Sequence, residues 1–294
     1  MSNDVVITRE IPPLPRRADD VHKGQLGRIA IVGGCTGEVT MIGAPALAAN
    51  AALRSGAGLV RMFVPAPIGI ATATLAPCAS VRALPTTADA LLESLRDYQS
   101  EVVAIGPGLG ESLSVAVVVE FFQRFEGPIV VDADALNLLA TLDRFDVPNP
   151  QRLVFTPHSG EVQRLLTSRR WDRAIGTAPA ARRAAACALV EFFGCTAVLK
   201  GHGTVVTNGQ RLYVNETGNS GMATAGTGDV LTGVIAALIG QGLVPFEAAI
   251  LAVYLHGLAG DFAAEEMGRQ SMTALDLIEF LPDAFCEWQN ADED

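Results

Sequence analysis

Short apolar runs of strand length alternate with alanine-rich stretches along most of this chain, and this alternation constrains the fold more than any other feature. The predicted strands are Arg28–Val32, Leu59–Val64, Val102–Ile105, Ile129–Asp132, Leu153–Phe155 and Thr196–Leu199. Predicted helices lie between several of them, at about Ala44–Ser55, Ser112–Phe125 and Leu136–Leu142. Such alternation is typical of a parallel sheet with both faces covered by helices. We therefore predict an α/β fold with a mostly parallel central sheet.

The second half of the chain departs from this pattern once. Thr204–Asn208 and Arg211–Asn215 flank the dipeptide Asn208-Gly209, which favours a two-residue hairpin turn. We therefore expect an antiparallel hairpin at one edge of the sheet. We also expect an exposed segment at Thr167–Thr177, which contains Arg169, Arg170 and Arg173. The remaining predicted helices are Thr227–Ile239, Pro245–Glu266 and a short helix near Asp276–Leu281.

No linker, repeat or low-complexity tract divides the chain. We expect a single domain over residues 1–294, with an N-terminal extension at 1–21 and an acidic tail at 289–294. A hydrophobic share of 49% is sufficient for a sizeable core. The net charge of −11 argues against nucleic acid as a partner, because binding to a polyanion depends on clustered Lys and Arg.

Neither the cysteines nor the apolar segments indicate secretion or a membrane. The five cysteines are scattered without metal-ligand spacing, which favours reduced thiols in the cytoplasm. The N-terminus lacks a basic region followed by an apolar run, so no signal peptide is predicted. The best apolar stretch, Val230–Phe246, contains Gln241 and Pro245 and is shorter than the roughly 20 apolar residues that a membrane span needs. We expect a cytoplasmic protein with no membrane contact.

The strongest chemical signal is the glycine-rich segment that leads into a predicted helix, residues 218–229, Gly-Asn-Ser-Gly-Met-Ala-Thr-Ala-Gly-Thr-Gly-Asp. Glycines allow a ligand to approach the backbone closely, and free amides at a helix start bind anions. Gly226, Thr227 and Gly228 are therefore a candidate anion hole. The helix dipole stabilises a carboxylate there, so we expect Asp229 to be ionised at neutral pH and to act as a general base. The alternative is an ordinary loop with a helix-start acid, since short motifs match by chance.

This segment resembles the anion-hole motif of the ribokinase-like superfamily, and its longer form Gly218–Gly233 is similar to that of NAD(P)H-hydrate dehydratases. Further segments similar to this family occur in matching order from about His22 to Leu281: His22-Lys23-Gly24, Gly33-Gly34, Gly43–Ala49, Arg54–Val60, Gly106–Gly110, Asp132–Asn137, Thr156–Glu161 and Leu199–Thr204. Together these motifs are specific to the family, although none of them is specific alone. The resemblance implies a ribokinase-like catalytic domain.

The resemblance also implies an activity in cofactor repair, the nucleotide-driven removal of water from the S epimer of NADH or NADPH hydrate. Bacterial members typically use ADP and eukaryotic members ATP, so ADP or ATP with Mg²⁺ is expected. Asp229 would deprotonate the hydroxyl of the damaged ring, which is phosphorylated before phosphate is eliminated. The family's hydrate contacts match Ala44, Gly108, His158 and Asp229, and its adenine-nucleotide contacts match Lys200, Gly201, His202, Gly203, Thr204 and Gly228. Glu161 matches, less closely, a residue that places magnesium through water in related kinases.

Several of these residues also have a plainer interpretation. Gly106–Gly110 could be only a tight turn, although ligands bind after strands of open α/β sheets. His158 alone is more often a surface or capping histidine, and Lys200 could be a solvent-exposed charge at a strand end. Asp132 and Asp134 are candidates either for assisting a metal or for capping the following helix.

A few positions depart from the family pattern or have no assigned role. Ser220 stands where proline is common and Ala225 where glycine is common; both are small, so we expect tuning rather than loss of the motif. Met41-Ile42 stands where the family frequently has an aromatic residue before Gly43-Ala44, and this replacement affects how the hydrate fits the site. His256 has no visible partner and is interpreted as structural, and His202 has the same plainer interpretation beside its match to a nucleotide contact.

Two other functions are compatible with these motifs. A small-molecule kinase of the same superfamily, acting on a vitamin-precursor alcohol, would share the fold and Asp229 but would leave a stable phosphoester. A non-catalytic nucleotide-binding regulatory module would bind without turnover. We further expect a homo-oligomer and, because no epimerase domain precedes the motifs, an NAD(P)H-hydrate epimerase on a separate chain.

Overall fold

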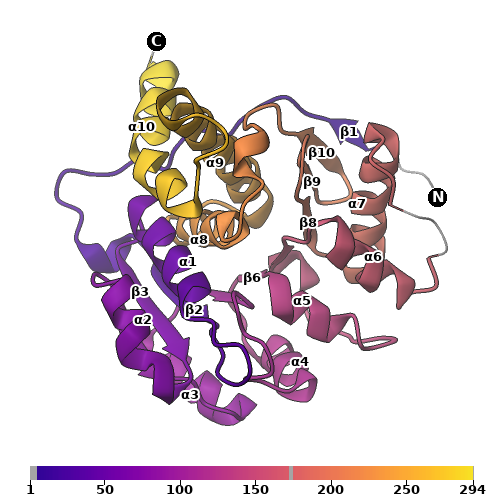
Figure 1. Cartoon of the computed structure of the whole chain (residues 1–294). Helices are drawn as coiled ribbons and strands as arrows, with labels where there is room; N and C mark the ends of the chain where they lie inside the picture. The colour runs from indigo at the N-terminus through magenta and orange to yellow at the C-terminus, as the bar shows by residue number, and fades with distance from the viewer. Residues whose placement is uncertain (1–4, 172–174, 294) are drawn as a thin grey trace.

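The structure is a computed structural model that describes residues 5–171 and 175–293, and its strands form one ten-stranded sheet (Figure 1). The strand order is β1-β10-β9-β8-β7-β6-β5-β2-β3-β4. Neighbouring strands run parallel except in the β8/β9 and β9/β10 pairs. The strands are β1 Val6–Ile7, β2 Arg28–Val32, β3 Leu59–Val64, β4 Ser80–Ala83, β5 Val102–Ile105, β6 Ile129–Val131, β7 Leu153–Phe155, β8 Thr196–Leu199, β9 Val205–Thr207 and β10 Arg211–Val214.

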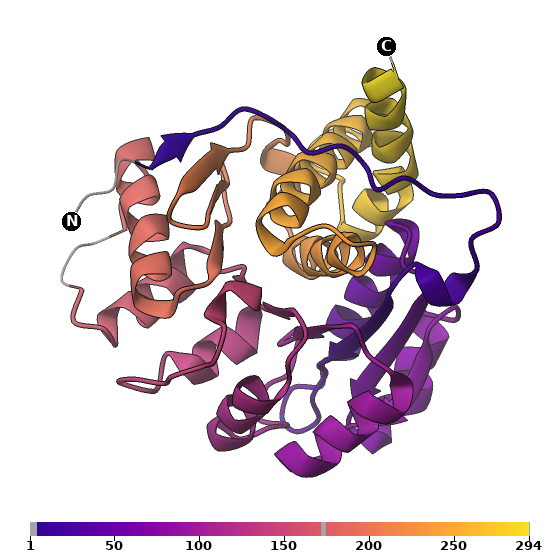
Figure 2. The same cartoon turned by 180° about the vertical axis from the view of Figure 1, so that it is seen from behind.

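Helices cover both faces of the sheet (Figures 1 and 2). They are α1 Gly43–Arg54, α2 Gly69–Leu75, α3 Ala88–Tyr98, α4 Val115–Arg124, α5 Ala133–Leu139, α6 Ser159–Thr167, α7 Pro179–Phe193, α8 Thr227–Gly240, α9 Pro245–Met267 and α10 Ala274–Glu293. Successive side chains of a strand point to opposite faces. In β2, Ile29 and Ile31 therefore join the core of α1, α8, α9 and α10, whereas Ala30 and Val32 join that of α3 to α7.

The predicted mostly parallel α/β fold is confirmed, and each predicted strand is present. The hairpin β9–β10 is also present, but β1 lies beyond it: Val6 and Ile7 pair with Arg211 and Leu212. Thus part of the segment expected as an extension at 1–21 belongs to the sheet. The mostly exposed strand β4 and the helices α2, α3, α6 and α7 were not predicted.

Several element boundaries differ from the predicted ones. The helix after β6 begins at Ala133 rather than Leu136, and the helix after β5 begins at Val115. The short piece near Asp276–Leu281 is part of the longer α10, which continues as helix through residues 289–293 of the expected acidic tail. The expected excursion follows the end of α6 at Thr167, but Arg173 lies outside the described residues.

The most apolar long helix of the described residues is a core helix. Among them α9 alone is long and apolar enough to cross a membrane, and 72% of its apolar window is buried within the protein. It packs closely against α10 and α8. The stretch Val230–Phe246 is not one segment, because α8 ends at Gly240 and α9 begins at Pro245.

Candidate active site

Loops of different origin meet at the carboxyl ends of the parallel strands. The chain order reverses between β2 and β5, where open α/β sheets form a ligand crevice. Here Gly34 N–H donates to Pro107 O at 2.9 Å and joins the two loops. Gly106 has φ +122°, and a Cβ there would overlap the carbonyl oxygen of Asp132. Glycine at this position therefore lets the β5 and β6 loops lie side by side.

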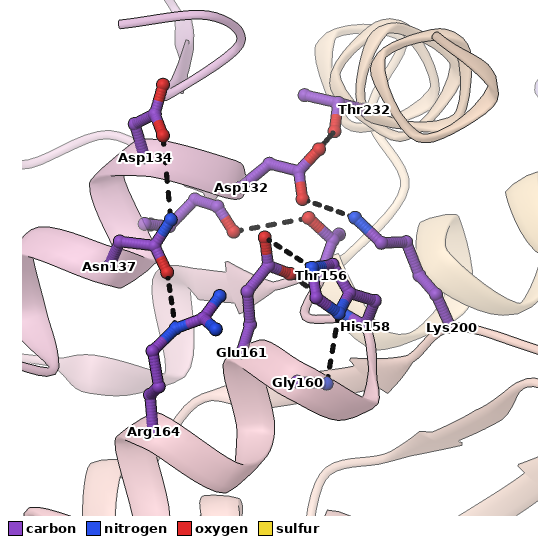
Figure 3. Close-up of polar contacts among 11 residues, drawn as sticks. Asp132, Asp134, Asn137, Thr156, His158, Gly160, Glu161, Arg164, Lys200 and Thr232 are labelled. Atoms are coloured by element: carbon purple, nitrogen blue, oxygen red, sulfur yellow. Dashed lines mark hydrogen bonds and ion pairs between the residues drawn. The ribbon is translucent and has the colours of Figure 1, made fainter. Parts of the chain in front are cut away.

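Asp132, directly after β6, organises a buried polar cluster (Figure 3). Lys200 Nζ donates to its Oδ1 at 2.5 Å, and Thr232 Oγ1 donates to its Oδ2 at 2.8 Å. Asp132 is 1% exposed and Thr232 is fully buried. Burial alone would lower the pKa of Lys200, but the carboxylates of Asp132 and Glu161 hold that pKa above its ordinary value. Lys200 is therefore a charged ammonium inside the site and not a solvent-exposed strand end.

Asp229 lies in the first turn of α8, half-buried, beside this cluster. Burial raises its pKa to about 7, and the Asp132 carboxylate adds to the rise while Lys200 opposes it. The expectation that Asp229 is ionised at neutral pH therefore holds for only part of the groups, because a carboxyl group with a pKa of about 7 is partly protonated there. The helix dipole acts in the expected direction, but desolvation and a like charge outweigh it. A carboxylate titrating near 7 is well suited to general base catalysis.

The candidate anion hole is the uncapped start of α8. Gly226 precedes the helix with φ +92°, and no side chain caps it. The first amides of the helix are thus free to bind an anion. The preceding loop is held by Asp261 of α9, whose carboxylate accepts from Gly218 N–H at 2.8 Å and from Asn219 Nδ2 at 3.0 Å. Ser220 and Ala225 lie in this loop without disturbing the helix start.

A cavity of about 1050 Å³ opens beside this helix start. Its wall contains every residue assigned by resemblance to the nucleotide, together with His158 and Thr227: Lys200, Gly201, His202, Gly203, Thr204 and Gly228. Gly201 and Gly203 have φ +137° and +62°, conformations that side chains rarely adopt. Its size suits a small-molecule ligand, for which cavities of roughly 300–1,000 Å³ are usual.

The residues assigned to the hydrate separate into two groups. His158 lines the large cavity, whereas Ala44 and Gly108 lie together under Met41: a Cβ on Gly108 would be 2.9 Å from Met41 Cβ and 3.1 Å from Ala44 Cβ. Met41 itself is 39% exposed. The position that departs from the family's frequent aromatic therefore covers the Ala44–Gly108 side.

His158 and Glu161 cap the start of α6. Gly160 N–H donates to His158 Nδ1 at 3.0 Å, and His158 N–H donates to Glu161 Oε2 at 2.7 Å. The Nδ1 atom is thus an acceptor, and Nε2 lies 3.3 Å from Glu161 Oε1. Burial raises the pKa of Glu161, and Lys200 opposes the rise. The capping role is established by this geometry, and the magnesium role of Glu161 stays a prediction.

The two carboxylates after β6 bind other groups instead of capping α5, and a role of either in assisting a metal stays a prediction. Asp132 makes no side-chain cap to α5, and Asp134 Oδ2 accepts from Gly110 N–H at 2.8 Å. Within residues 5–171 and 175–293, no group of three or more His, Cys, Asp or Glu is arranged to hold a metal ion. Mg²⁺ seldom needs such a group, because it keeps waters and binds substrate phosphates.

Comparison with known proteins decides the family. The profile described as NAD(P)H-hydrate dehydratase matches residues 29–283. The chain belongs to the NAD(P)H-hydrate dehydratase family. It is 40% identical to the ADP-dependent (S)-NAD(P)H-hydrate dehydratase of Neisseria meningitidis, over 86% of this chain and 82% of that protein. It is 45% identical to the bifunctional NAD(P)H-hydrate repair enzyme of Moorella thermoacetica, over 92% of this chain and 51% of that protein.

This family member spans about half the length of several bifunctional relatives that it matches. Among solved structures, the ADP/ATP-dependent NAD(P)H-hydrate dehydratase of Bacillus subtilis, co-crystallised with ATP/Mg²⁺, superposes with a TM-score of 0.73 at 27% identity. That alignment covers 94% of this chain and 95% of the Bacillus protein. The predicted ribokinase-like fold is confirmed.

Sequence reasoning missed residues that shape this family site from a distance. Asp261 lies in α9 outside every motif, and Thr232 lies within the segment Gly218–Gly233 but was given no role. His256, interpreted as structural, lines the large cavity, and its Nε2 lies 2.9 Å from the carbonyl oxygen of Thr227. Burial lowers the pKa of His256 to about 4, so the ring is neutral and donates from Nε2. A neutral donor at this place fixes the first turn of α8 without adding charge.

Proposed function

We propose that this protein removes water from the S epimer of NADH or NADPH hydrate, using ADP or ATP. The observation that carries the proposal is Asp229: a carboxyl group with a pKa of about 7, beside a charged Lys200 and the free amides of α8. Family membership and the names of the relatives support the substrate class.

In the proposed mechanism, Asp229 accepts the proton of the hydroxyl on the damaged nicotinamide ring. The hydroxyl oxygen bonds to the terminal phosphorus of the nucleotide, and the bond from that phosphorus to the bridging oxygen breaks. The amides of Gly226, Thr227 and Gly228 stabilise the charge that develops on the phosphoryl oxygens. Loss of phosphate and a ring proton then restores NAD(P)H, so the products with ADP are AMP and free phosphate.

The two substrates would approach Asp229 from different sides. We assign the adenine nucleotide to the large cavity, along Lys200, Gly201, His202, Gly203, Thr204 and Gly228. We assign the nicotinamide to the side of Ala44 and Gly108, and we assign His158, which lines the large cavity, to the hydrate where the two substrates meet. The charges of Lys200 and Asp134 both affect the pKa of Asp229. Lys200 lines the large cavity, and Asp134 accepts a hydrogen bond from Gly110 on the other side. This supports a position of Asp229 between the nucleotide side and the nicotinamide side.

Magnesium fits this arrangement through the nucleotide. Glu161 points toward the same region as Asp132 and Lys200 (Figure 3), and would place the ion through water. The ion would offset the charge of the phosphates in the transfer. The solved Bacillus relative was co-crystallised with ATP/Mg²⁺, which supports this assignment.

Incubation of the purified protein with NADH hydrate and ADP, or ATP, tests the proposal. Recovery of NADH absorbance with stoichiometric free phosphate is expected, and Asp229→Asn is the matched control. A stable phosphoester would instead identify a small-molecule kinase, and nucleotide binding without any product would identify a regulatory module. Either result would overturn the dehydratase assignment.

We further propose that the protein works in the cytoplasm beside an NAD(P)H-hydrate epimerase, as a homo-oligomer. The bifunctional names of longer relatives support the pairing with an epimerase. All five cysteines are unpaired, as is usual in a reducing compartment. Sedimentation of the pure protein tests the oligomer, since a monomer at micromolar concentration would contradict it.

A further inference from the structure

A second cavity, of about 420 Å³, lies at the end of the sheet opposite the candidate active site. Its wall includes Arg28 and Ser80, the first residues of β2 and β4, and Leu59, the first residue of β3. The loops of the candidate active site begin after Val32, at the other end of β2. Five residues of parallel strand span about 17 Å, so the two cavities are separate.

The wall of this second cavity is basic in an otherwise acidic protein. Lys23, Arg28 and Arg61 contribute three cations, although the chain has only 21 Lys and Arg against 32 Asp and Glu. Among the described residues none of these three forms an ion pair. The carboxylate in the wall, Asp97, pairs with Arg82 at 3.4 Å. The positive charges are therefore unneutralised within the described structure.

The two arginines are held in place by the protein. Arg28 donates to the carbonyl oxygen of Tyr98 at 3.4 Å. Arg61 donates to Ser80 Oγ at 3.0 Å and lies 4.3 Å from the centre of the Tyr98 ring. Tyr98 adds no negative charge, because burial raises its pKa to about 12. Fixed guanidinium groups that converge without a counter-ion form a ready site for an anion.

The segment His22-Lys23-Gly24, singled out in the sequence, positions the third cation. His22 caps the turn, with Nδ1 accepting from Gly24 N–H at 3.1 Å. A Cβ at Gly58 would overlap the carbonyl oxygen of Lys23, so glycine there lets this turn lie against the start of β3. Lys23 is one of only two lysines in the chain, and the proposed reaction makes no use of it.

We propose that this cavity is a second binding site, which takes the phosphate group of a small metabolite between Lys23, Arg28 and Arg61. The ligand is more suitably a phosphate than a carboxylate. Two guanidinium groups and an ammonium match the oxygen geometry and the double charge of a phosphate, whereas a carboxylate offers only two oxygens and a single charge. The volume lies within the usual range for a small-molecule site. Leu59 and Val60 supply apolar wall for an organic portion of the ligand.

Cys78 provides a local reporter of occupancy, because it lines this cavity and is exposed. Cys286 is also exposed, lies outside this wall and serves as the internal control. The 294-residue protein, saturated with ADP, is labelled with iodoacetamide in rising inorganic phosphate, and each peptide is quantified by mass spectrometry. At ten times the Kd only about a tenth of the sites stay empty, so labelling of Cys78 should slow about tenfold. Labelling of Cys286 should not change.

Matched charge removals complete the experiment. Lys23→Gln, at an exposed position, should raise the phosphate concentration for half protection severalfold, and Arg28→Gln should do the same. Arg96→Gln removes an exposed charge from α3 outside this wall and should leave the protection curve unchanged. These variants keep Asp229, so dehydration of NADH hydrate measured in parallel reports on the proposed function independently.

Three outcomes would overturn the second site. Phosphate could leave the Cys78 rate unchanged, or chloride at equal ionic strength could slow it equally, which is simple screening. Alternatively, Cys78 could become protected as protein concentration rises without phosphate, which would identify this face as a contact between copies of the chain.

Discussion

Replacing Asp229 by Asn tests the proposed base most directly. The side chain keeps its size at the start of α8 but can no longer accept the hydroxyl proton. General base catalysis contributes about 10²–10⁴ in rate, or about 3–5 kcal/mol of activation free energy. We therefore expect turnover on NADH hydrate to fall at least about a hundredfold. Nucleotide affinity should change little, because a base acts mainly in the transition state.

The pH dependence of turnover sharpens this test. Only ionised Asp229 is active, and its pKa is about 7, so about a tenth of the groups are active at pH 6 and about nine-tenths at pH 8. Turnover of the native protein should therefore rise roughly fivefold from pH 6 to 7. The residual turnover of Asp229→Asn should lack this rise. Steady-state rates across pH, with a nucleotide titration at each pH, measure both. Near-normal turnover of the variant, or an unchanged profile, would refute Asp229 as the base.

The same pKa predicts a stability effect. Burial raises the pKa of Asp229 from 3.8 to about 7, so the folded state binds the proton more tightly than the unfolded state. The stability of the native protein relative to Asp229→Asn is therefore greatest below pH 3.8 and is lost as pH rises through 7. The melting temperature of the variant, minus that of the native protein, should increase from pH 5 to 7 and level off above. A difference independent of pH would contradict the raised pKa.

Three further changes separate the remaining parts of the site. His158→Ala should raise KM for the hydrate while calorimetric ADP affinity stays nearly constant; an equal loss of both would contradict the division into two halves. Gly228→Ala would place a Cβ 3.2 Å from Lys200 Nζ and should shift the ammonium, so nucleotide affinity should fall in a fluorescence titration. Gly69→Ala, at φ −55° with the nearest side-chain atom at an ordinary 3.6 Å, should leave the affinity unchanged. Excess EDTA should stop turnover and added Mg²⁺ restore it; full activity in EDTA would remove the magnesium assignment of Glu161.

The strands could be predicted because burial on both faces leaves a plain signature in them. Each residue of Val102–Ile105 is buried, and such a run can hardly be anything but a central strand. The edge strand Ser80–Ala83 is mostly exposed and mixes polar with apolar residues, so no comparable apolar run marks it. Helix α6 begins with a histidine cap rather than the more frequent Ser, Thr, Asp or Asn. The start of α6 could not be recognised in the sequence for that reason.

Some parts of the candidate site could likewise be predicted from the sequence, and others could not. Glycine spacing and the helix start identified Gly226–Asp229, because these are local features. The pairing of Asp132 with Lys200 joins residues 68 positions apart, and no local pattern encodes it. The ionisation of Asp229 was overestimated because the helix dipole can be predicted from the sequence, whereas the desolvation of Asp229 and its approach to Asp132 arise only from the tertiary fold.

Asp132 links the two electrostatic properties that the proposed reaction needs. Its carboxylate holds Lys200 charged in the interior, where a lone ammonium would tend to lose its proton. Burial is the main cause of the raised pKa of Asp229, and the same carboxylate adds to it, which makes Asp229 a stronger proton acceptor when ionised. Thr232 takes the second oxygen of Asp132 and so fixes its direction. One buried carboxylate, which need not touch either substrate, thereby helps to prepare both the cation that we propose for the phosphates and the base that we propose for the hydroxyl.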